Sequence, residues 1–176
     1  MNDLLEIMRT RRSVRKYTAQ EISDEDVKKI LSAALLAPSG HSKYPCEFIV
    51  VKNRETLNKM SQCRVNVAKM LETAFAAVVV IADKEKSDTI VEDCSVAMMN
   101  MELEATSLGI GNCWIQIRGR NDSADGSTCE EYLRGILNFP EKFACQSILA
   151  LGYPEKMPRQ RELDKLKFDK IHYENF

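Results

Sequence analysis

The segment from residue 90 to residue 108 constrains the fold of this chain more than any other part of its sequence. It predicts a helix that is apolar on most of its circumference, and Gly109 follows at the usual position of a helix C-cap. The apolar positions are Val91, Cys94, Val96, Ala97, Met98, Met99, Met101, Leu103 and Ala105. Such a helix must be buried on nearly all sides, which is difficult in a chain of 176 residues. We therefore expect a second subunit to cover part of it.

Capping patterns and apolar spacing predict five further helical segments. The first two begin with D-x-x-E and S-x-x-D patterns, Pro38 ends the second, and Ser127-x-x-Glu130 is expected to cap the last. The predicted segments are residues 3–9, 23–35, 55–61, 65–73 and 127–137.

Apolar and β-branched runs predict four strands, at residues 48–51, 76–82, 110–117 and 147–151. The second is the most apolar, so we expect it to be central in the sheet. Because helices and strands alternate irregularly, the expected class is α+β or mixed α/β, in a single domain over residues 1–176.

Residues 155–176 are mostly charged but carry spaced apolar side chains, at Leu163, Leu166, Phe168, Ile171, Tyr173 and Phe176. A solvated tail is one interpretation of this segment. The apolar spacing favours the other, a C-terminal arm that packs on its own or the partner subunit.

Charge and cysteine spacing exclude several classes of function. Lys and Arg total 25 against 26 Asp and Glu, so the net charge of -1 creates no field that draws the chain onto nucleic acid or an anionic membrane. The start of the chain lacks a basic-then-apolar leader, and the longest apolar run, residues 74–82, is about half a membrane span. We expect a soluble, cytoplasmic protein. The six cysteines include no CxxC pair, which favours reduced, non-catalytic thiols over a metal centre or disulfides.

One cluster of side chains remains as a candidate for chemistry. The chain has no G-x-G-x-x-G, P-loop or G-x-S-x-G motif, and two histidines cannot form a multi-histidine metal site. The basic run Arg11-Arg12-Ser13-Val14-Arg15-Lys16 follows the first predicted helix. It is either a solvated turn that offsets the helix dipole or a phosphate site, because guanidinium groups bind phosphate bidentately. Arg159 and Arg161 could close on the same phosphate.

Four motifs in this order together resemble the nitroreductase family of FMN-dependent oxidoreductases, over nearly the whole chain. They are Arg11-Arg12-Ser13-Val14-Arg15, then Ala37-Pro38-Ser39 leading to Pro45-x-x-Phe48-Ile49-Val50-Val51, then Leu108-Gly109-Ile110-Gly111 before Cys113-Trp114-Ile115, and Leu149-Ala150-Leu151-Gly152-Tyr153-Pro154. The resemblance implies an α+β, three-layer fold with a mostly antiparallel sheet flanked by helices. It also implies an intertwined homodimer with two FMN sites built from both subunits.

The resemblance assigns FMN contacts to several segments of this chain. Arg11, Arg12 and Ser13 would contact the phosphate and ribityl chain, and Arg159 and Arg161 the phosphate. Arg15 would reach the N1/O2 edge of the flavin, where a cation stabilises the reduced, anionic ring.

Further contacts are implied around the ring itself. Asn66 would bind its pyrimidine edge, and Lys69 would lie where nicotinamide or acceptor arrives; the alternative is two polar residues on an exposed helix face. Pro38, Ser39 and Gly40 of the partner would pack against the isoalloxazine. The backbone at Gln116 and Ile117 would donate to flavin N5.

The sequence departs from the family pattern after Ser39. The usual Asn-x-Gln-Pro-Trp is replaced by Ser42-Lys43-Tyr44-Pro45-Cys46, which puts the shape of the substrate pocket in doubt. His41 and Tyr44 either line that pocket or are ordinary surface-loop residues.

The resulting prediction is an FMN-dependent NAD(P)H oxidoreductase that reduces nitroaromatics, quinones or similar small acceptors by ping-pong hydride transfer. No metal and no catalytic side chain is expected beyond Arg15 as an electrostatic stabiliser, since the flavin carries the chemistry. The alternatives are a non-enzymatic flavin-binding redox module, a specialised flavin reaction such as reductive dehalogenation, and nucleic-acid binding through the basic run.

Overall fold

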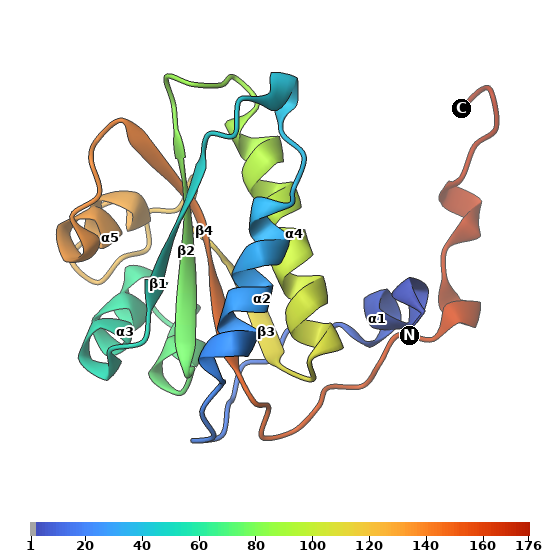
Figure 1. Cartoon of the computed structure of the whole chain (residues 1–176), viewed down its shortest axis with the longest axis horizontal. Coiled ribbons are helices and arrows are strands. Elements are labelled where there is room, and N and C mark those ends of the chain that lie inside the picture. Colours follow the sequence, from blue (N-terminus) through green and yellow to red (C-terminus); the bar gives the residue numbers. More distant parts are fainter. Residues whose placement is uncertain (1–2) are drawn as a thin grey trace.

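The computed structural model describes residues 3–176, which form a four-stranded sheet with helices on both faces (Figure 1). The strands are β1 (Cys46–Val51), β2 (Ala76–Asp83), β3 (Gly111–Gln116) and β4 (Phe143–Gly152), in the order β1-β2-β4-β3. Every neighbouring pair is antiparallel. The structure therefore has the α+β class and the three layers that the sequence predicted.

The helices lie in pairs on the two faces of the sheet (Figure 1). They are α1 (Leu4–Thr10), α2 (Asp24–Leu35), α3 (Arg54–Met60), α4 (Ile90–Ser107) and α5 (Cys129–Leu137). Helices α2 and α4 cover one face, α3 and α5 cover the other, and α1 stands at the side. The predicted N-caps of the first two helices form, because Asp3 accepts from the amide of Leu5 and Ser23 from that of Asp26.

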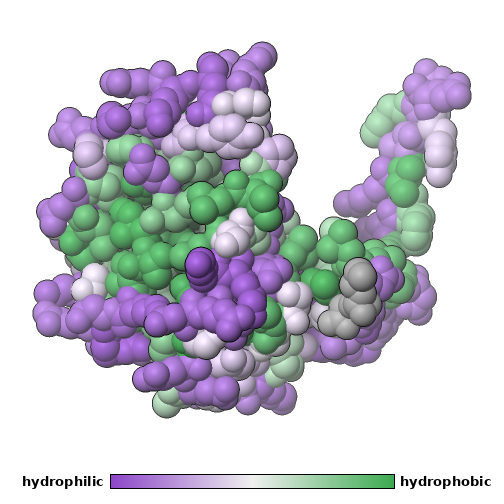
Figure 2. Space-filling view, viewed as in Figure 1, coloured by the Kyte–Doolittle hydropathy of each residue, from purple (hydrophilic) through white to green (hydrophobic). Residues whose placement is uncertain are grey.

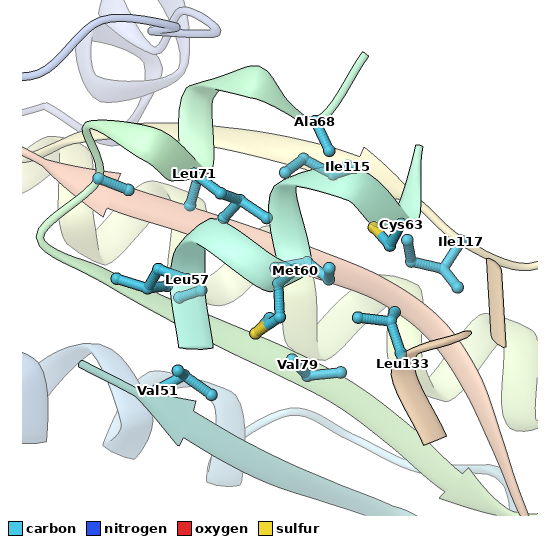
Figure 3. Packing of buried hydrophobic residues seen from close by; sticks show 14 of the residues in the cluster. Val51, Leu57, Met60, Cys63, Ala68, Leu71, Val79, Ile115, Ile117 and Leu133 are labelled. Atoms are coloured by element: carbon cyan, nitrogen blue, oxygen red, sulfur yellow. The ribbon is translucent and has the colours of Figure 1, made fainter. Parts of the chain in front are cut away.

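The two faces of the sheet bury two separate apolar clusters. All eight residues of β2 are buried, as expected of a central strand, and their side chains alternate between the faces. Val78 and Val80 pack in the cluster under α2 and α4, whereas Ala77 and Val79 pack in the cluster under α3 and α5. Figure 3 shows the second cluster.

The helix predicted at residues 65–73 does not form, so the expectation that Asn66 and Lys69 share a helix is wrong. Only a short 3₁₀ turn, Lys69–Glu72, is present. Asn66 has a φ of 63°, a left-handed conformation that an asparagine tolerates and that interrupts a helix. The amide of Val65 is bound instead to the carbonyl of Asp122, 2.8 Å away.

The predicted cap of the last helix is wrong by one residue. Thr128 and Glu131 form the capping box of α5, in place of Ser127 and Glu130. Glu130 pairs with Arg134 of the same helix at 2.6 Å and accepts from the amide of Cys145 at 2.9 Å. The starting residue of α5 is therefore set by the contact of Glu130 with β4, and a local sequence pattern does not reveal such a contact.

Helix α4 is covered on the side that faces the sheet and open on another. Its residues Met98 and Met101 are fully buried, but Val96 and Met99 are 38% and 41% exposed. A further apolar area lies over β1 and α2, where Val50 and Leu35 are exposed (Figure 2). Within residues 3–176, no helix combines the length and the apolar character needed to cross a membrane.

The C-terminal arm leaves the body of the protein after β4. The amide of Arg161 donates to the carbonyl of Arg9, and the Arg9 side chain donates back to the carbonyl of Arg161 at 3.2 Å. From Leu163 to Phe176 every residue is exposed, and this part projects away from the sheet (Figure 1). The arm therefore touches its own chain near α1, and its apolar side chains are left uncovered.

Candidate cofactor site

The basic run lies along β3, the strand at one edge of the sheet. Ser13 forms a parallel bridge with Asn112, and the amide of Val14 donates to the carbonyl of Asn112 at 2.9 Å. The side chain of Val14 is buried in the core, whereas Ser13 is half-buried and Arg15 is exposed. A short extended segment thus presents its polar side chains beside an open strand edge.

The anchors of this segment also explain one glycine of the C-terminal motif. Tyr17 is buried, and its hydroxyl donates to the carbonyl of Val14 at 2.7 Å. A Cβ atom on Gly152 would lie 2.8 Å from the Tyr17 ring, closer than a side chain can approach. Gly152 is therefore required for the segment to lie flat against the end of β4.

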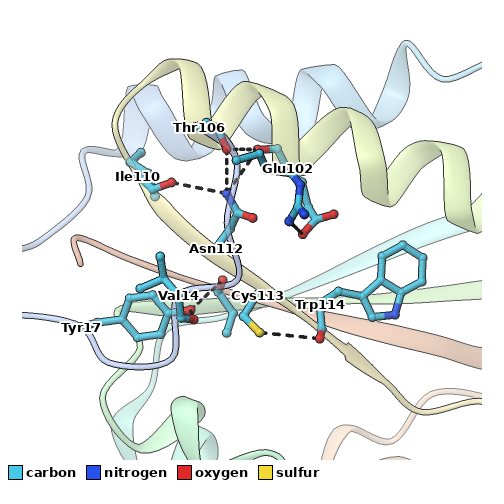
Figure 4. Close-up of polar contacts among 10 residues, drawn as sticks. Val14, Tyr17, Glu102, Thr106, Ile110, Asn112, Cys113 and Trp114 are labelled. Carbon is cyan, nitrogen blue, oxygen red and sulfur yellow. Dashed lines mark hydrogen bonds and ion pairs between the residues drawn. The ribbon is translucent and has the colours of Figure 1, made fainter. Parts of the chain in front are cut away.

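Asn112 ties this edge strand to α4 (Figure 4). Its side-chain amide donates to the carbonyl of Glu102 at 3.2 Å and to the hydroxyl of Thr106 at 3.1 Å. The basic segment, β3 and the second half of α4 consequently form one connected unit.

Arg11 is held by a buried carboxylate on α4. Its guanidinium lies 3.2 Å from Glu102, whose side chain is only 4% exposed. Burial raises the pKa of Glu102, and the nearby charge of Arg11 partly opposes that shift. Arg11 therefore has a fixed position and an existing anionic partner.

The other two arginines of the run fit an anionic ligand. Neither Arg12 nor Arg15 forms an ion pair with any residue in the part of the chain that the structure describes. Arg12 also carries a buried Nε that has no hydrogen-bond partner, which is unusual for a guanidinium. Uncompensated positive charge and an unused donor beside the Ser13 hydroxyl are suited to a phosphate group.

The far end of β3 is joined to the loop that carries Asn66. Arg64 donates to the carbonyl of Gln116 at 3.2 Å and is paired with Asp122, with Nε and Nη2 each within 3.2 Å of its carboxylate. This pairing holds the pKa of Asp122 below its usual range. Asn66 and Lys69 are exposed on the loop so fixed.

The structure distinguishes the two backbone amides that were expected to meet the cofactor. The amide of Ile117 already donates to the carbonyl of Gln146. The carbonyl of Asn112 faces the open edge of β3, and strand alternation places the backbone of Gln116 on the same edge. Asn112 and Gln116 are about 13 Å apart at 3.3 Å per residue, so the basic run beside Asn112 and the loop of Arg64 beside Gln116 lie at opposite ends of β3.

Residues 38–40 lie elsewhere in the chain, at the first turn of α4. The buried carboxylate of Asp93 accepts from the Ser39 hydroxyl at 2.9 Å and from the Gly40 amide at 3.0 Å. Asp93 and Glu102 are nine residues apart on one helix, which corresponds to about 14 Å. Within one chain, the structure does not bring residues 38–40 together with Arg11.

The loop after Gly40 is sharply turned and lies at the surface. His41, Ser42 and Tyr44 have φ values of 52°, 55° and 46°, and the Tyr44 amide donates to the Ser39 hydroxyl at 2.9 Å. Tyr44 lines a small apolar pocket with Pro38, Cys46 and Phe48, which His41 does not line. Both side chains are exposed, and neither meets the basic run in the same chain.

Arg159 and Arg161, the second basic pair, differ in what they contact. The backbone of Arg161 lies beside Arg9, two residues before Arg11, whereas the Arg159 guanidinium is paired with Glu162. Both arginine side chains are exposed.

Sequence reasoning missed the three acidic residues that organise these segments, namely Glu102, Asp93 and Asp122. One signal was present for two of them, because Asp93 and Glu102 are acidic residues within a mostly apolar helix. A carboxylate on a buried face needs a partner, and such a residue indicates one elsewhere in the chain. Asp122 lies in a polar loop, where its role has no local signature.

Comparison with solved structures defines the class of fold. An FMN-dependent nitroreductase from Clostridium difficile superposes with a TM-score of 0.94 at 39% identity, and the match covers 98% of this chain and 99% of that one. A protein from Parabacteroides distasonis named NADH dehydrogenase/NAD(P)H nitroreductase superposes with a TM-score of 0.90 at 30% identity, over the whole of both chains.

Comparison of sequences identifies the family. Residues 8–77 and 61–153 match the model of the Nitroreductase family. A protein of Archaeoglobus fulgidus named NADH dehydrogenase/NAD(P)H nitroreductase is 41% identical over 181 residues, which cover both sequences completely. This chain belongs to the nitroreductase family, which confirms the resemblance found in its motifs.

Proposed function

We propose that this protein is an FMN-dependent NAD(P)H oxidoreductase that reduces small oxidised acceptors such as nitroaromatics or quinones. One observation carries the proposal, the uncompensated charge of Arg12 and Arg15 with the unused Nε of Arg12 beside the open edge of β3. It occurs in a fold whose solved relative at 39% identity is named an FMN-dependent nitroreductase.

The residues of this chain would hold the cofactor along β3. Arg12 and Ser13 bind its phosphate, with Arg11 fixed beside them by Glu102 and with Arg159 and Arg161 closing from the arm. Arg15 and the Gln116 amide face the ring, and Asn66 meets its far edge. When bound, FMN supplies two-electron transfer, from NAD(P)H first and then to the acceptor, by a ping-pong scheme at one position.

The working unit we propose is a homodimer. Residues 38–40 lie about 14 Å along α4 from the region of Arg11, so the site of one chain takes this loop from its partner. Lys69 of one subunit and His41 and Tyr44 of the other would then border the space for nicotinamide and acceptor. The exposed side chains of Val96 and Met99 and the projecting arm supply the apolar contact surface.

The compartment we propose is the cytoplasm. All six cysteines are free thiols, as is usual where the surroundings are reducing. Neither nucleic acid nor a membrane is proposed as a partner, because the net charge of -1 provides no broad basic face.

Binding of FMN to flavin-free protein tests the assigned site. Arg12→Ala removes a charge-assisted phosphate contact worth roughly 1.5–3 kcal/mol, so we expect the Kd for FMN to rise about tenfold to a hundredfold. Lys28→Ala, which removes an exposed cation of α2, is the matched control and should leave the Kd unchanged. Equal affinities for the two variants would show that the basic run does not hold FMN.

A further inference from the structure

Two cysteines that are distant in sequence meet between the sheet and α4. Cys46 is the first residue of β1, Cys94 lies in α4, and their Sγ atoms are 3.4 Å apart. All six cysteines fall within residues 3–176, and no other two of their sulfur atoms form such a contact there. The two sulfur atoms are therefore already close, compared with about 2.05 Å for a disulfide bond.

The two thiols differ in access. Cys94 is 1% exposed, whereas Cys46 is only partly buried. Cys46 lines an apolar pocket of about 50 Å³ beside Tyr44, Pro45 and Phe48. That volume exceeds what one water molecule needs, so Cys46 lies beside a space that admits a small reagent, whereas Cys94 does not line it.

The two thiols also differ in acidity. The two thiols are hydrogen-bonded to each other, and this contact lowers the pKa of Cys46 and raises that of Cys94. Burial alone acts in the opposite direction, as at Cys63, where it raises the pKa to about 12. The more accessible sulfur is therefore also the one more readily deprotonated, and the thiolate is the nucleophile in cysteine chemistry.

We propose that Cys46 and Cys94 form an oxidisable dithiol site, which hydrogen peroxide or a similar small hydroperoxide converts to an intramolecular disulfide. The Cys46 thiolate attacks one peroxide oxygen, so an S–O bond forms and the O–O bond breaks. The departing oxygen takes a proton and leaves as water from hydrogen peroxide, or as an alcohol from an organic hydroperoxide. The Cys94 sulfur then attacks the sulfenic acid of Cys46; the S–S bond forms and the S–O oxygen leaves as water. The two thiols lose two electrons in total, and the peroxide gains them.

The site is independent of the proposed flavin chemistry but next to the loop assigned to it. Asp93, the residue before Cys94, holds Ser39 and Gly40, and Cys46 follows the turn at Tyr44. The disulfide would join β1 to α4 directly beneath that loop.

The experiment uses the purified full-length protein, reduced and freed of reductant, with hydrogen peroxide as the probe. We expect free thiols to fall from six to four per chain, the mass of the monomer to fall by two hydrogens, and dithiothreitol to restore both. Trypsin should release residues 44–52 joined to residues 87–118. The second peptide also contains Cys113, so the Cys113→Ala variant serves as the control and should still form the link.

Two further variants separate the roles of the thiols. Cys46→Ala should keep its five remaining thiols under the same treatment. Cys94→Ala should stop at a sulfenic acid on Cys46, which dimedone traps. In the untreated wild type, iodoacetamide should label Cys46 at least about tenfold faster than Cys63. Retention of all six thiols by the wild type would overturn the proposal, and this result depends on no variant. Failure of folded Cys113→Ala protein to form the link would overturn it as well.

Discussion

Among single residues, the buried carboxylate of Glu102 holds the guanidinium of Arg11 in the candidate cofactor site. Glu102 has almost no exposed surface, and Arg11 lies 3.2 Å away as its compensating charge. A buried pair of this kind adds little net stability, but removal of one partner leaves an uncompensated charge. The function of Arg11 and the stability of the fold are therefore linked through α4.

Arg11→Ala should destabilise the flavin-free protein by about 3 kcal/mol at neutral pH, because ionised Glu102 loses its partner. Burial already raises the folded-state pKa of Glu102, and loss of Arg11 raises it further. Stability should then decline as pH rises from the unfolded pKa of about 4.3 through the folded pKa, since the folded state holds the proton more tightly. Urea unfolding across this range measures the effect.

Arg11→Ala with Glu102→Gln supplies the control for that prediction. A neutral amide at position 102 carries no charge to compensate and does not titrate. The double variant should therefore regain most of the lost stability and should lose the pH dependence that Glu102 causes. Destabilisation by Arg11→Ala that is equal at all pH values would contradict the role given to Glu102.

Arg15 should act on the redox ring, in contrast to Arg12 on the phosphate. Arg15→Ala removes positive charge near the part of FMN that becomes more negative on reduction. We expect the two-electron midpoint potential of the bound flavin to fall by about 30 mV, equivalent to about 1.4 kcal/mol. Arg12→Ala should weaken binding and leave the potential nearly unchanged. Redox titration of both variants at saturating FMN measures the two potentials. A larger change of potential in Arg12→Ala than in Arg15→Ala would refute the proposed orientation of FMN along β3.

At the scale of elements, the loop of residues 38–44 is fixed by the first turn of α4. Asp93 accepts from Ser39 and Gly40, and the Gly40 position has no room for a side chain. A Cβ atom there would lie 2.3 Å from the Thr89 hydroxyl oxygen. The shape of the proposed acceptor side is therefore set by contacts with α4 and not by the loop alone.

Gly40→Ala should destabilise the protein by about 1–3 kcal/mol through this overlap. Thr89→Ala removes the clashing oxygen, so the combination of both changes should be more stable than the sum of the two single effects predicts. Thermal unfolding of the four proteins measures the coupling. Simple additivity would show that the close contact is relieved elsewhere.

Elements that are determined by local sequence patterns could be predicted, whereas those determined by contacts between distant residues could not. The apolar periodicity of β2 and α4 predicts these elements well, because burial against the sheet is what selects their residues. The caps at Asp3 and Ser23 are local and were predicted as well. The loop at Asn66 and the start of α5 were not, since they are decided by contacts with Asp122 and Cys145. The motifs named the basic run, but only the fold pairs Arg11 with Glu102, 91 residues away.

At the scale of the whole molecule, the uncovered apolar surface supports the proposed homodimer. The sequence predicted that a second subunit would cover part of α4, and in the single chain Val96 and Met99 are left exposed. Met98 and Met101 of the same helix are fully buried against their own sheet. Substitutions at Val96 or Met99 therefore test association of the proposed dimer, whereas substitutions at Met98 or Met101 would test folding of the chain.

Met99→Asp should give a folded monomer that binds FMN at least about tenfold more weakly, because the partner's loop no longer completes the site. Lys28→Asp introduces the same charge at an exposed position of α2 and should remain dimeric. Light scattering and FMN binding on the same samples make the comparison. A wild-type monomer with fully bound FMN would contradict the proposed dimer.

The central claim is that this chain holds a flavin which NAD(P)H reduces. The most direct measurement is the visible absorption spectrum of the FMN-loaded protein without oxygen, recorded before and after one equivalent of NADH or NADPH. We expect a bound-flavin spectrum that bleaches with at least one of the two donors and returns when a quinone or nitroaromatic is added. A protein that takes up no FMN, or whose bound FMN neither donor reduces, would contradict it.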